Sequence, residues 1–318
     1  MPELPIPSYD DILAASDRIS GYAHITPVLT SRTINEFTGG EIYFKCENFQ
    51  RAGAFKFRGA CNSVFSLTDE EAAKGVATHS SGNHGQALAL AARLRGIPAY
   101  IVMPENSPRV KVNAVKGYGA EVTFCESNQQ ARESTLHKIV EKSGATFIHP
   151  YDHFNVIAGQ GTCALELLNQ QQDLDAVFAP VGGGGLLSGT SITAKERPDA
   201  VMVFGAEPEK ADDAYQSLKS GTLQRFDTTQ TIADGLRTTL SERTFAIIQN
   251  YTDDIFTVGE QEIVDAMRLI WERMKIIIEP SCSVPVAALL NGRFDCSGKK
   301  IGVILTGGNV DLDHLPWQ

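Results

Sequence analysis

The sequence predicts an α/β fold with parallel sheets, because short strand-like segments alternate with helical stretches along most of its 318 residues. DAVFAPV near residue 177 and IGVILT near residue 303 are continuously apolar, as strands are when helices cover both faces of a sheet. Both segments run into glycine-rich turns at their carboxyl ends. In open α/β sheets, such turns are where ligands bind.

The predicted strands follow one another through the chain and suggest two sheets. They are EIYFKC near residue 43, GVATHS near 76, AYIVMP near 101, EVTFCE near 122, TFIHP near 147, DAVFAPV near 177, VMVFGAEP near 203 and IGVILTGG near 303. Residues 75–125 resemble two consecutive β-α-β units whose helices end at Gly96 and Gly117. We therefore expect a large domain of residues 1–66 plus 153–318, with a small, mobile domain of residues 67–152 inserted into it.

Composition and charge exclude several classes of function. The net charge is −10, from 28 basic and 38 acidic side chains, with no long block of either sign, which argues against a nucleic-acid partner. An anionic ligand must then be held locally, by loop amides and helix ends. The six cysteines show no zinc-ligand spacing, and no signal peptide or membrane-spanning run is visible. We expect a cytoplasmic protein without a membrane partner.

Lys56 is a candidate for cofactor attachment. It stands between two phenylalanines in ENFQRAGAFKFRGA, residues 47–60. A lysine in apolar surroundings has a lowered pKa, and its free amine forms a Schiff base with an aldehyde. The alternative is a lysine at the start of an amphipathic helix whose ammonium group reaches solvent. Taken alone, the motif favours that alternative.

A phosphate-binding loop is predicted where a buried strand runs directly into a helix through Gly182, Gly183, Gly184 and Gly185. Without Cβ atoms, consecutive amides converge on a phosphate, and the helix N-terminus adds the positive end of its dipole. A plain turn needs fewer glycines. The loop matches neither the Walker A nor the dinucleotide-binding pattern, which argues against nucleotides.

A carboxylate-binding loop is predicted in HSSGNHGQAL, residues 79–88. Ser80, Ser81, Gly82 and Asn83 precede a helical stretch, and their amides and hydroxyls, with His84, suit a carboxylate. Serine and asparagine are also ordinary helix caps. The motif fits helix capping and carboxylate binding equally well.

Thr306 stands at the end of the last apolar strand, directly before two glycines. A hydroxyl in this position would face a heteroaromatic nitrogen. The alternative is an ordinary turn residue.

Together, the four motifs resemble those of the fold-type II pyridoxal-phosphate enzymes, in particular the serine racemase and serine/threonine dehydratase group. The resemblance runs from TPVLTSRTINE near residue 26 to TGGNVDLD near residue 306 and is strongest to short members such as serine racemase and threo-3-hydroxyaspartate ammonia-lyase. It implies a tryptophan synthase β-like fold, with two open, twisted, mostly parallel sheets in a large and a small domain. It also implies pyridoxal 5′-phosphate as cofactor and a homodimer.

The resemblance implies a role for each motif. Lys56 would carry the cofactor, with Phe55 beside the ring, Asn83 at its phenolic oxygen and Thr306 facing the pyridine nitrogen, where many relatives have serine. The phosphate would be held by Gly182, Gly183, Gly184, Gly185 and Leu186. The substrate carboxylate would be held by Ser80, Ser81, Gly82, Asn83 and His84.

A metal site is implied by EPEKADDAYQS, residues 207–217, which is similar to the divalent-cation site of serine racemases. Glu207, the carbonyl of Ala211 and Asp213 would bind Mg²⁺, Mn²⁺ or Ca²⁺, and hard oxygen ligands suit these ions. The alternative is a solvated acidic helix start.

The implied reaction removes water and ammonia from a small 3-hydroxy amino acid (3-hydroxyaspartate, serine or threonine), with Lys56 taking the Cα proton. The alternative is racemisation, in which Ser81 returns the proton from the opposite face. A noncatalytic cofactor carrier would need neither Ser81 nor the carboxylate loop. A dicarboxylate substrate needs another cation, and Arg132 is a candidate because its segment resembles one near the racemase active site. The alternative is an ordinary surface arginine.

The sequence departs from its relatives at two places near the implied site. Ala54 stands where many members have serine, and Tyr151, Asp152 and His153 differ from the mammalian racemase. The second segment approaches the active site in relatives. The sequence therefore does not decide which residues form the pocket for the substrate side chain.

Overall fold

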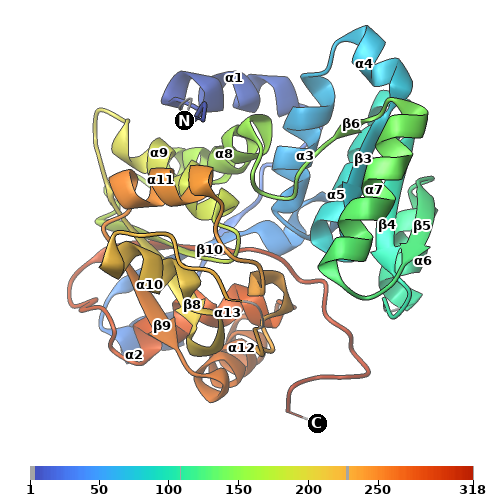
Figure 1. Cartoon of the computed structure of the whole chain (residues 1–318). Helices are drawn as coiled ribbons and strands as arrows, with labels where there is room; N and C mark the ends of the chain where they lie inside the picture. Colours follow the sequence, from blue (N-terminus) through green and yellow to red (C-terminus); the bar gives the residue numbers. More distant parts are fainter. Residues whose placement is uncertain (1–3, 108, 227–228, 318) are drawn as a thin grey trace.

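The computed structural model describes residues 4–107, 109–226 and 229–317 and contains two sheets flanked by helices (Figure 1). The larger sheet has the strand order β1-β2-β10-β7-β8-β9, and the smaller has β5-β4-β3-β6. All pairings between these strands are parallel except that of β1 with β2. The prediction of an α/β fold with two mostly parallel sheets is confirmed.

Most of the strands coincide with predicted segments. The strands are β1 Val28–Thr30, β2 Glu41–Cys46, β3 Val76–His79, β4 Ala99–Pro104, β5 Glu121–Cys125, β6 Thr146–Phe147, β7 Ala176–Pro180, β8 Met202–Pro208, β9 Asp254–Val258 and β10 Lys300–Leu305. Sequence reasoning missed β1 and β9, the two edge strands of the larger sheet.

Helices occupy most of the connections between strands. They are α1 Tyr9–Ile19, α2 Arg32–Thr38, α3 Lys56–Phe65, α4 Asp69–Lys74, α5 Asn83–Arg95, α6 Arg109–Gly117, α7 Gln129–Ser143, α8 Phe154–Gln170, α9 Gly185–Lys195, α10 Asp213–Ser220, α11 Glu242–Tyr251, α12 Glu260–Met274 and α13 Pro280–Leu290, with short 3₁₀ turns at Glu47–Phe49, Arg51–Gly53, Glu209–Ala211 and Asp234–Leu236. Helix α5 ends at a left-handed Gly96 and helix α6 ends at Gly117, as predicted, and the left-handed residue after α6 is Gly119 (φ 87°). No helix in the described residues is long and apolar enough to cross a membrane.

Helices cover both faces of the six-stranded sheet, which explains the continuously apolar strands. Along β7, Phe178 joins the core formed with α12 and α13, whereas Val177 and Ala179 join the core formed with α8 and α9. Successive side chains of a strand point to opposite faces, so both sets must be apolar. Strands β7 and β10 are parallel neighbours, so their carboxyl ends lie next to each other at the same edge of the sheet.

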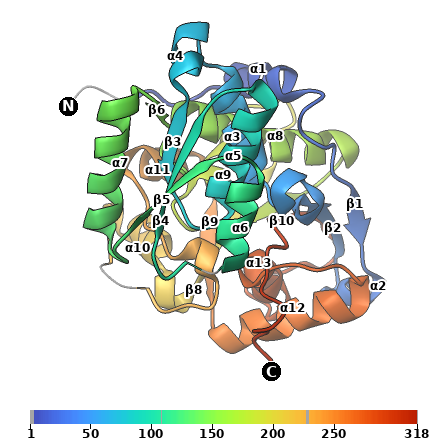
Figure 2. The same ribbon diagram turned by 90° about the vertical axis from the view of Figure 1, so that its right-hand side faces the viewer.

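The four-stranded sheet is also covered on both faces. Ile101 and Met103 of β4 pack in one core with α5 and α6, and Val102 packs in another with α7. Figures 1 and 2 accordingly show α7 on one side of this sheet and α5 with α6 on the other. All four strands fall inside residues 67–152, and the domain boundaries themselves stay a prediction.

Candidate active site

The residues predicted for catalysis and cofactor binding come from the start of α3, from the loops after β3 and β7, and from the end of β10. Lys56 is the first residue of α3, and its side chain is half-buried. Its Nζ donates a hydrogen bond to the carbonyl of Pro150 at 2.9 Å and lies 5.2 Å from the centre of the Phe55 ring. Burial lowers the pKa of Lys56 to about 8, against the opposing effect of the Glu279 carboxylate. Near neutral pH this amine is therefore far closer to its free, nucleophilic form than an exposed lysine.

The segment before Lys56 is joined to the end of β10. Ala54 forms an isolated bridge with Gly307, and the Phe55 amide donates to the Thr306 carbonyl at 2.9 Å. Thr306 is buried at this junction. This junction brings Thr306 close to the start of α3, although Thr306 and Lys56 lie 250 positions apart in the sequence.

The glycine loop forms an N-terminus without a side-chain cap. Strand β7 ends at Pro180 and α9 begins at Gly185, after Gly184 in the left-handed region (φ 81°). A Cβ on Gly183 would lie 2.4 Å from three ring carbons of Tyr151, and a Cβ on Gly182 would lie 2.9 Å from the Cα of Leu236. Glycine is thus required here by close packing as well as by backbone angle. The first amides of α9 have no side-chain partner, which suits a phosphate.

The carboxylate loop connects β3 to α5. Strand β3 ends at His79 and α5 begins at Asn83, with no side-chain hydrogen bond capping the helix. The Gly82 amide donates to Ser80 Oγ at 3.3 Å. Uncapped amides together with the hydroxyls of Ser80 and Ser81 therefore remain available to a carboxylate.

His84 is buried beneath this loop. Its Nε2 lies 3.1 Å from the carbonyl of Ile148, so this nitrogen is the protonated donor. Burial holds the pKa of His84 well below its usual value, and the ring is therefore neutral. The main-chain amide of His84 lies in the first turn of α5, at the end of the helix that has no side-chain cap.

Asn83 is held by two residues that the sequence reasoning did not identify. Its Nδ2 donates to Glu279 Oε1 at 2.8 Å, and its Oδ1 accepts from Asn309 Nδ2 at 2.9 Å. Burial and the charge of Asp234 raise the pKa of Glu279 to about 8. These contacts fix the plane of the Asn83 amide. Asn309 belongs to the quoted TGGNVDLD motif, but nothing in the local sequence marks Glu279.

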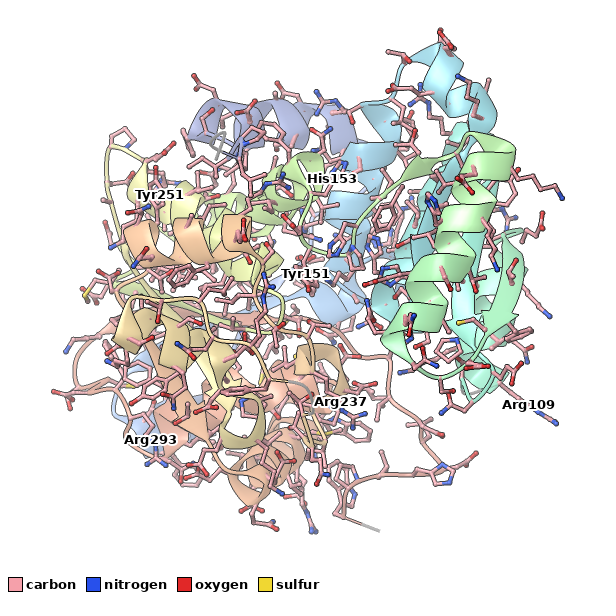
Figure 3. The ribbon with its side chains drawn as sticks, viewed as in Figure 1. Arg109, Tyr151, His153, Arg237, Tyr251 and Arg293 are labelled. Carbon is pink, nitrogen blue, oxygen red and sulfur yellow. The ribbon has the colours of Figure 1, made fainter. Side chains whose placement is uncertain are left out.

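The segment from His149 to His153 forms the wall next to Lys56. His149 Nδ1 accepts from the amides of Asp152 at 2.9 Å and Tyr151 at 3.3 Å, and the Tyr151 ring stacks edge-on against it at 4.6 Å. Burial and nearby His79 lower the pKa of His149 to about 3. Asp152 pairs with Arg243 of α11 at 3.0 Å. Figure 3 shows Tyr151 and His153 between α11 and the small sheet.

Arg132 lies in the first turn of α7 and is half-buried. Within the described residues it makes no ion pair, and its Nε is buried without a hydrogen-bond partner. Its charge contributes to the lowered pKa of His79, the residue directly before Ser80, although burial is the larger cause. Arg132 is therefore a cation beside the carboxylate loop.

The acidic cluster lies outside the reaction centre. Glu207 at the end of β8 is buried and accepts from the amides of Ala214 at 3.3 Å and Tyr215 at 2.8 Å, and Asp213 accepts from the Leu240 amide at 2.8 Å. Burial and Asp213 raise the pKa of Glu207 well above its usual value, and burial raises that of Asp213 to about 6. Among the described residues no third His, Cys, Asp or Glu completes a metal-binding group, so a cation here would rest on two carboxylates and a carbonyl.

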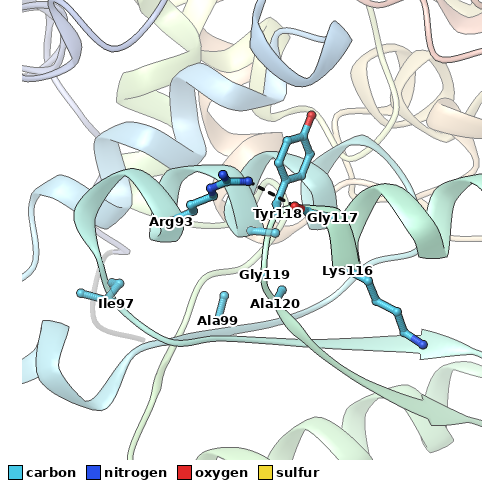
Figure 4. A pocket seen from close by; sticks show the side chains of 9 residues that line it. Arg93, Ile97, Ala99, Lys116, Gly117, Tyr118, Gly119 and Ala120 are labelled. Carbon is cyan, nitrogen blue, oxygen red and sulfur yellow. Dashed lines mark hydrogen bonds between the residues drawn. The ribbon is translucent and has the colours of Figure 1, made fainter.

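A separate cavity of about 400 Å³ lies at the amino ends of β4 and β5 (Figure 4). Arg93, Ala99 and Lys116 help to line it, and Arg93 Nη1 donates to the Gly117 carbonyl at 3.2 Å. These residues belong to the end of α5, the start of β4 and the end of α6, whereas the candidate site lies at the start of α5. The cavity is not part of that site.

A half-buried lysine of lowered pKa, next to an uncapped glycine loop in an α/β fold, is characteristic of pyridoxal-phosphate enzymes. The chain matches the family described as "Pyridoxal-phosphate dependent enzyme" over residues 19–307, and it belongs to this family.

Several relatives match nearly the whole chain. A beta-hydroxyaspartate dehydratase of Paracoccus denitrificans is 51% identical over 98% of this chain and 99% of that protein. An L-threo-3-hydroxyaspartate ammonia-lyase of Saccharomyces cerevisiae is 50% identical over 96% of this chain and 94% of that protein. The solved structure of serine racemase from Dictyostelium discoideum is 54% identical, covers 96% of this chain and 99% of its own, and has a TM-score of 0.92. The resemblance to this group is confirmed.

Proposed function

We propose that this chain is a dehydratase and ammonia-lyase that converts a small 3-hydroxy amino acid into a 2-oxo acid and ammonia. The observation that carries the proposal is the Lys56 amine, with its pKa near 8, which donates to the carbonyl of Pro150 beside the Tyr151 that packs on Gly183, and whose charge acts on His84 of the carboxylate loop. Relatives named for 3-hydroxyaspartate at about half identity support the same reaction.

The residues present fit pyridoxal 5′-phosphate. Gly182 to Leu186 would hold the phosphate, because their amides have no side-chain partner at the start of α9. Lys56 would bind the aldehyde, with Phe55 beside the ring. Asn83 would meet the phenolic oxygen with its amide plane fixed by Glu279, and Thr306 would face the ring nitrogen. When bound, the cofactor supplies the electron sink that makes the Cα proton acidic.

The chain's own groups would then position the substrate and move its protons. The amides and hydroxyls from Ser80 to His84 hold the α-carboxylate and so fix the direction of the Cα–H bond. The Lys56 amine takes the Cα proton. As an ammonium ion, Lys56 has a proton to return to the departing hydroxyl group, which leaves as water.

Arg132 supports 3-hydroxyaspartate as the preferred substrate. A second carboxylate would supply the partner that the buried Nε lacks in the described structure. Serine and threonine have no group of that charge.

Racemisation is the second candidate activity. The observation in its favour is Ser81, whose hydroxyl belongs to the carboxylate loop and would return a proton from the face opposite Lys56. Similarity to serine racemases supports it as well. Both activities would share one site.

A divalent cation is proposed at Glu207, the Ala211 carbonyl and Asp213. Burial and the charge of Asp213 raise the pKa of Glu207, burial raises that of Asp213, and no cation among the described residues pairs with either carboxylate. Mg²⁺, Mn²⁺ or Ca²⁺ would compensate both charges. Its role would be structural, because it would tie the end of β8 to the start of α10.

A homodimer and a division into two domains are proposed on the same resemblance. Exposed Phe49 and Ile277 lie in neighbouring segments, since Asn48 Nδ2 donates to the Ile277 carbonyl at 3.2 Å. Such an apolar surface suits a second copy of the chain. Residues 67–152 would form the small domain that carries the carboxylate loop.

The experiment that tests the proposed function is to incubate the purified holoenzyme with 3-hydroxyaspartate, serine and threonine, each in defined configuration. Formation of the 2-oxo acid and of the opposite enantiomer is measured for each. Rapid 2-oxo acid formation from at least one substrate is expected. Enantiomer formation without 2-oxo acid would make racemisation the function instead.

A further inference from the structure

A buried ionic cluster surrounds Arg58, two residues after Lys56 in α3. The guanidinium donates to both oxygens of Glu47 at 2.7 and 2.8 Å, and to both oxygens of Glu166 at 2.7 and 2.8 Å. The side chains of Arg58 and Glu47 are 0% exposed. None of these groups has a part in the proton transfers proposed for Lys56.

The cluster is electrically balanced and saturated with hydrogen bonds. Lys45 Nζ donates to Glu166 Oε2 at 2.8 Å, Gln170 Oε1 at 2.7 Å and the Thr26 carbonyl at 2.8 Å. Two cations thus face two carboxylates. Replacing a buried ion pair with apolar side chains is often neutral or stabilising, so stability alone does not account for the cluster. What the planar guanidinium adds is a fixed geometry.

The segment between Glu47 and Arg58 needs such a constraint. Ala52 adopts a left-handed conformation (φ 56°), which is strained for a residue with a Cβ, and Gly53 follows it at φ 69°. Asn309 Nδ2 donates to the Ala52 carbonyl at 2.8 Å, and the Gly308 amide donates to the Gly53 carbonyl at 3.0 Å. Helix α3 has no side-chain cap at Phe55. Local interactions alone therefore do not fix its first turn.

We propose that Arg58 is a positioning residue for Lys56. Its bidentate pair with Glu47 joins the two ends of the 47–58 segment, and its bidentate pair with Glu166 attaches that segment to α8. Together they fix the rotation of the first turn of α3 and so the direction of Lys56 Nζ toward Pro150. A lysine at position 58 keeps the charge but cannot hold two carboxylates in parallel. The inference rests on the proposed function in one respect, the attachment of the cofactor to Lys56.

The test compares Arg58→Lys with Lys45→Met in the holoenzyme. Lys45 belongs to the same cluster and is equally buried, but the hydrogen bonds of its Nζ go to Thr26, Glu166 and Gln170, which lie outside the 47–58 segment. Three quantities are measured: the visible absorbance of the bound cofactor, the rate at which hydroxylamine releases it, and kcat with KM.

Arg58→Lys should shift the absorbance band, and should change both the hydroxylamine rate and kcat by at least about tenfold with little change in KM. A displacement of about 1 Å at a reacting group costs up to about 100-fold in rate. Lys45→Met should lower the melting temperature without these effects. If Arg58→Lys does not fold, Glu47→Gln is measured in its place, because it keeps the side-chain shape and removes the charge.

Two results would overturn the inference. One is a wild-type band, hydroxylamine rate and kcat in Arg58→Lys or Glu47→Gln. The other is the same set of changes in Lys45→Met at an equal loss of melting temperature, which would make the cluster merely structural. Attachment of the cofactor to a different lysine would instead refute the proposed function, so the two failures are distinguishable.

Discussion

Replacing Arg132 with methionine should change which hydroxy amino acid the enzyme prefers. Its Nε is buried and lacks a hydrogen-bond partner in the described residues, so the fold already bears the cost of desolvating this nitrogen. A substrate carboxylate would satisfy it. A hydrogen bond to a charged group contributes about 1.5–3 kcal/mol, and each 1.36 kcal/mol is a factor of ten in rate. The kcat/KM for 3-hydroxyaspartate should therefore fall by roughly 10- to 160-fold.

The assay measures 2-oxo acid formation from 3-hydroxyaspartate and from serine with the wild-type and Arg132→Met enzymes. Serine turnover should be nearly unchanged, because serine has no second carboxylate. Lys138→Met is the matched control, since Lys138 is an exposed cation on the same helix. An unchanged ratio of the two substrates, or an equal loss for both, would show that Arg132 does not select the dicarboxylate.

Three further predictions concern the proton donor, the cation and the pKa of Lys56. Ser81→Ala should suppress racemisation far more than elimination from the L-substrate, measured by chiral chromatography beside 2-oxo acid formation; equal losses with the cofactor retained would contradict separate roles. Chelation should lower activity and melting temperature together, and Mg²⁺, Mn²⁺ or Ca²⁺ should restore both. Asp213→Ala should mimic chelation and not respond to metal, whereas Asp212→Ala should still respond; metal-free protein of unchanged melting temperature would refute the site. In cofactor-free protein, the rate of pyridoxal-phosphate attachment should rise with pH and level off above about 8, because only the free amine attacks and burial lowers the pKa of Lys56 to about 8. A midpoint near 10.5, the ordinary value for lysine, in stopped-flow absorbance would contradict this.

The features that sequence reasoning predicted are encoded locally. Strands such as β7 and β10 show a continuous apolar run that ends at glycines. This pattern can be read from the local sequence without knowing which segments pack around it. The start of α9 after Gly184 follows for the same reason. In contrast, β1 has three residues and β9 is a partly exposed edge strand, so neither carries a strong periodic signal.

The features that were missed depend on contacts between distant segments. Glu279 and Asn309 hold the Asn83 amide from positions 196 and 226 residues away. The need for glycine at position 183 comes partly from the Tyr151 ring, which belongs to a different segment. The buried ring of His84 also hydrogen-bonds to the carbonyl of Ile148, 64 residues away. Tertiary packing decides each of these, and no local pattern in the sequence encodes it.

The most direct test of the account is to reduce the holoenzyme with borohydride, digest it and locate the pyridoxyl group by mass spectrometry. The account predicts a single modified peptide containing GAFKFRGA, with the label on Lys56, together with loss of the visible absorbance. The structure supports this because burial lowers the pKa of Lys56 to about 8 and its amine donates to the carbonyl of Pro150, beside the Tyr151 that packs on the glycine loop. A label on any other lysine would contradict the account.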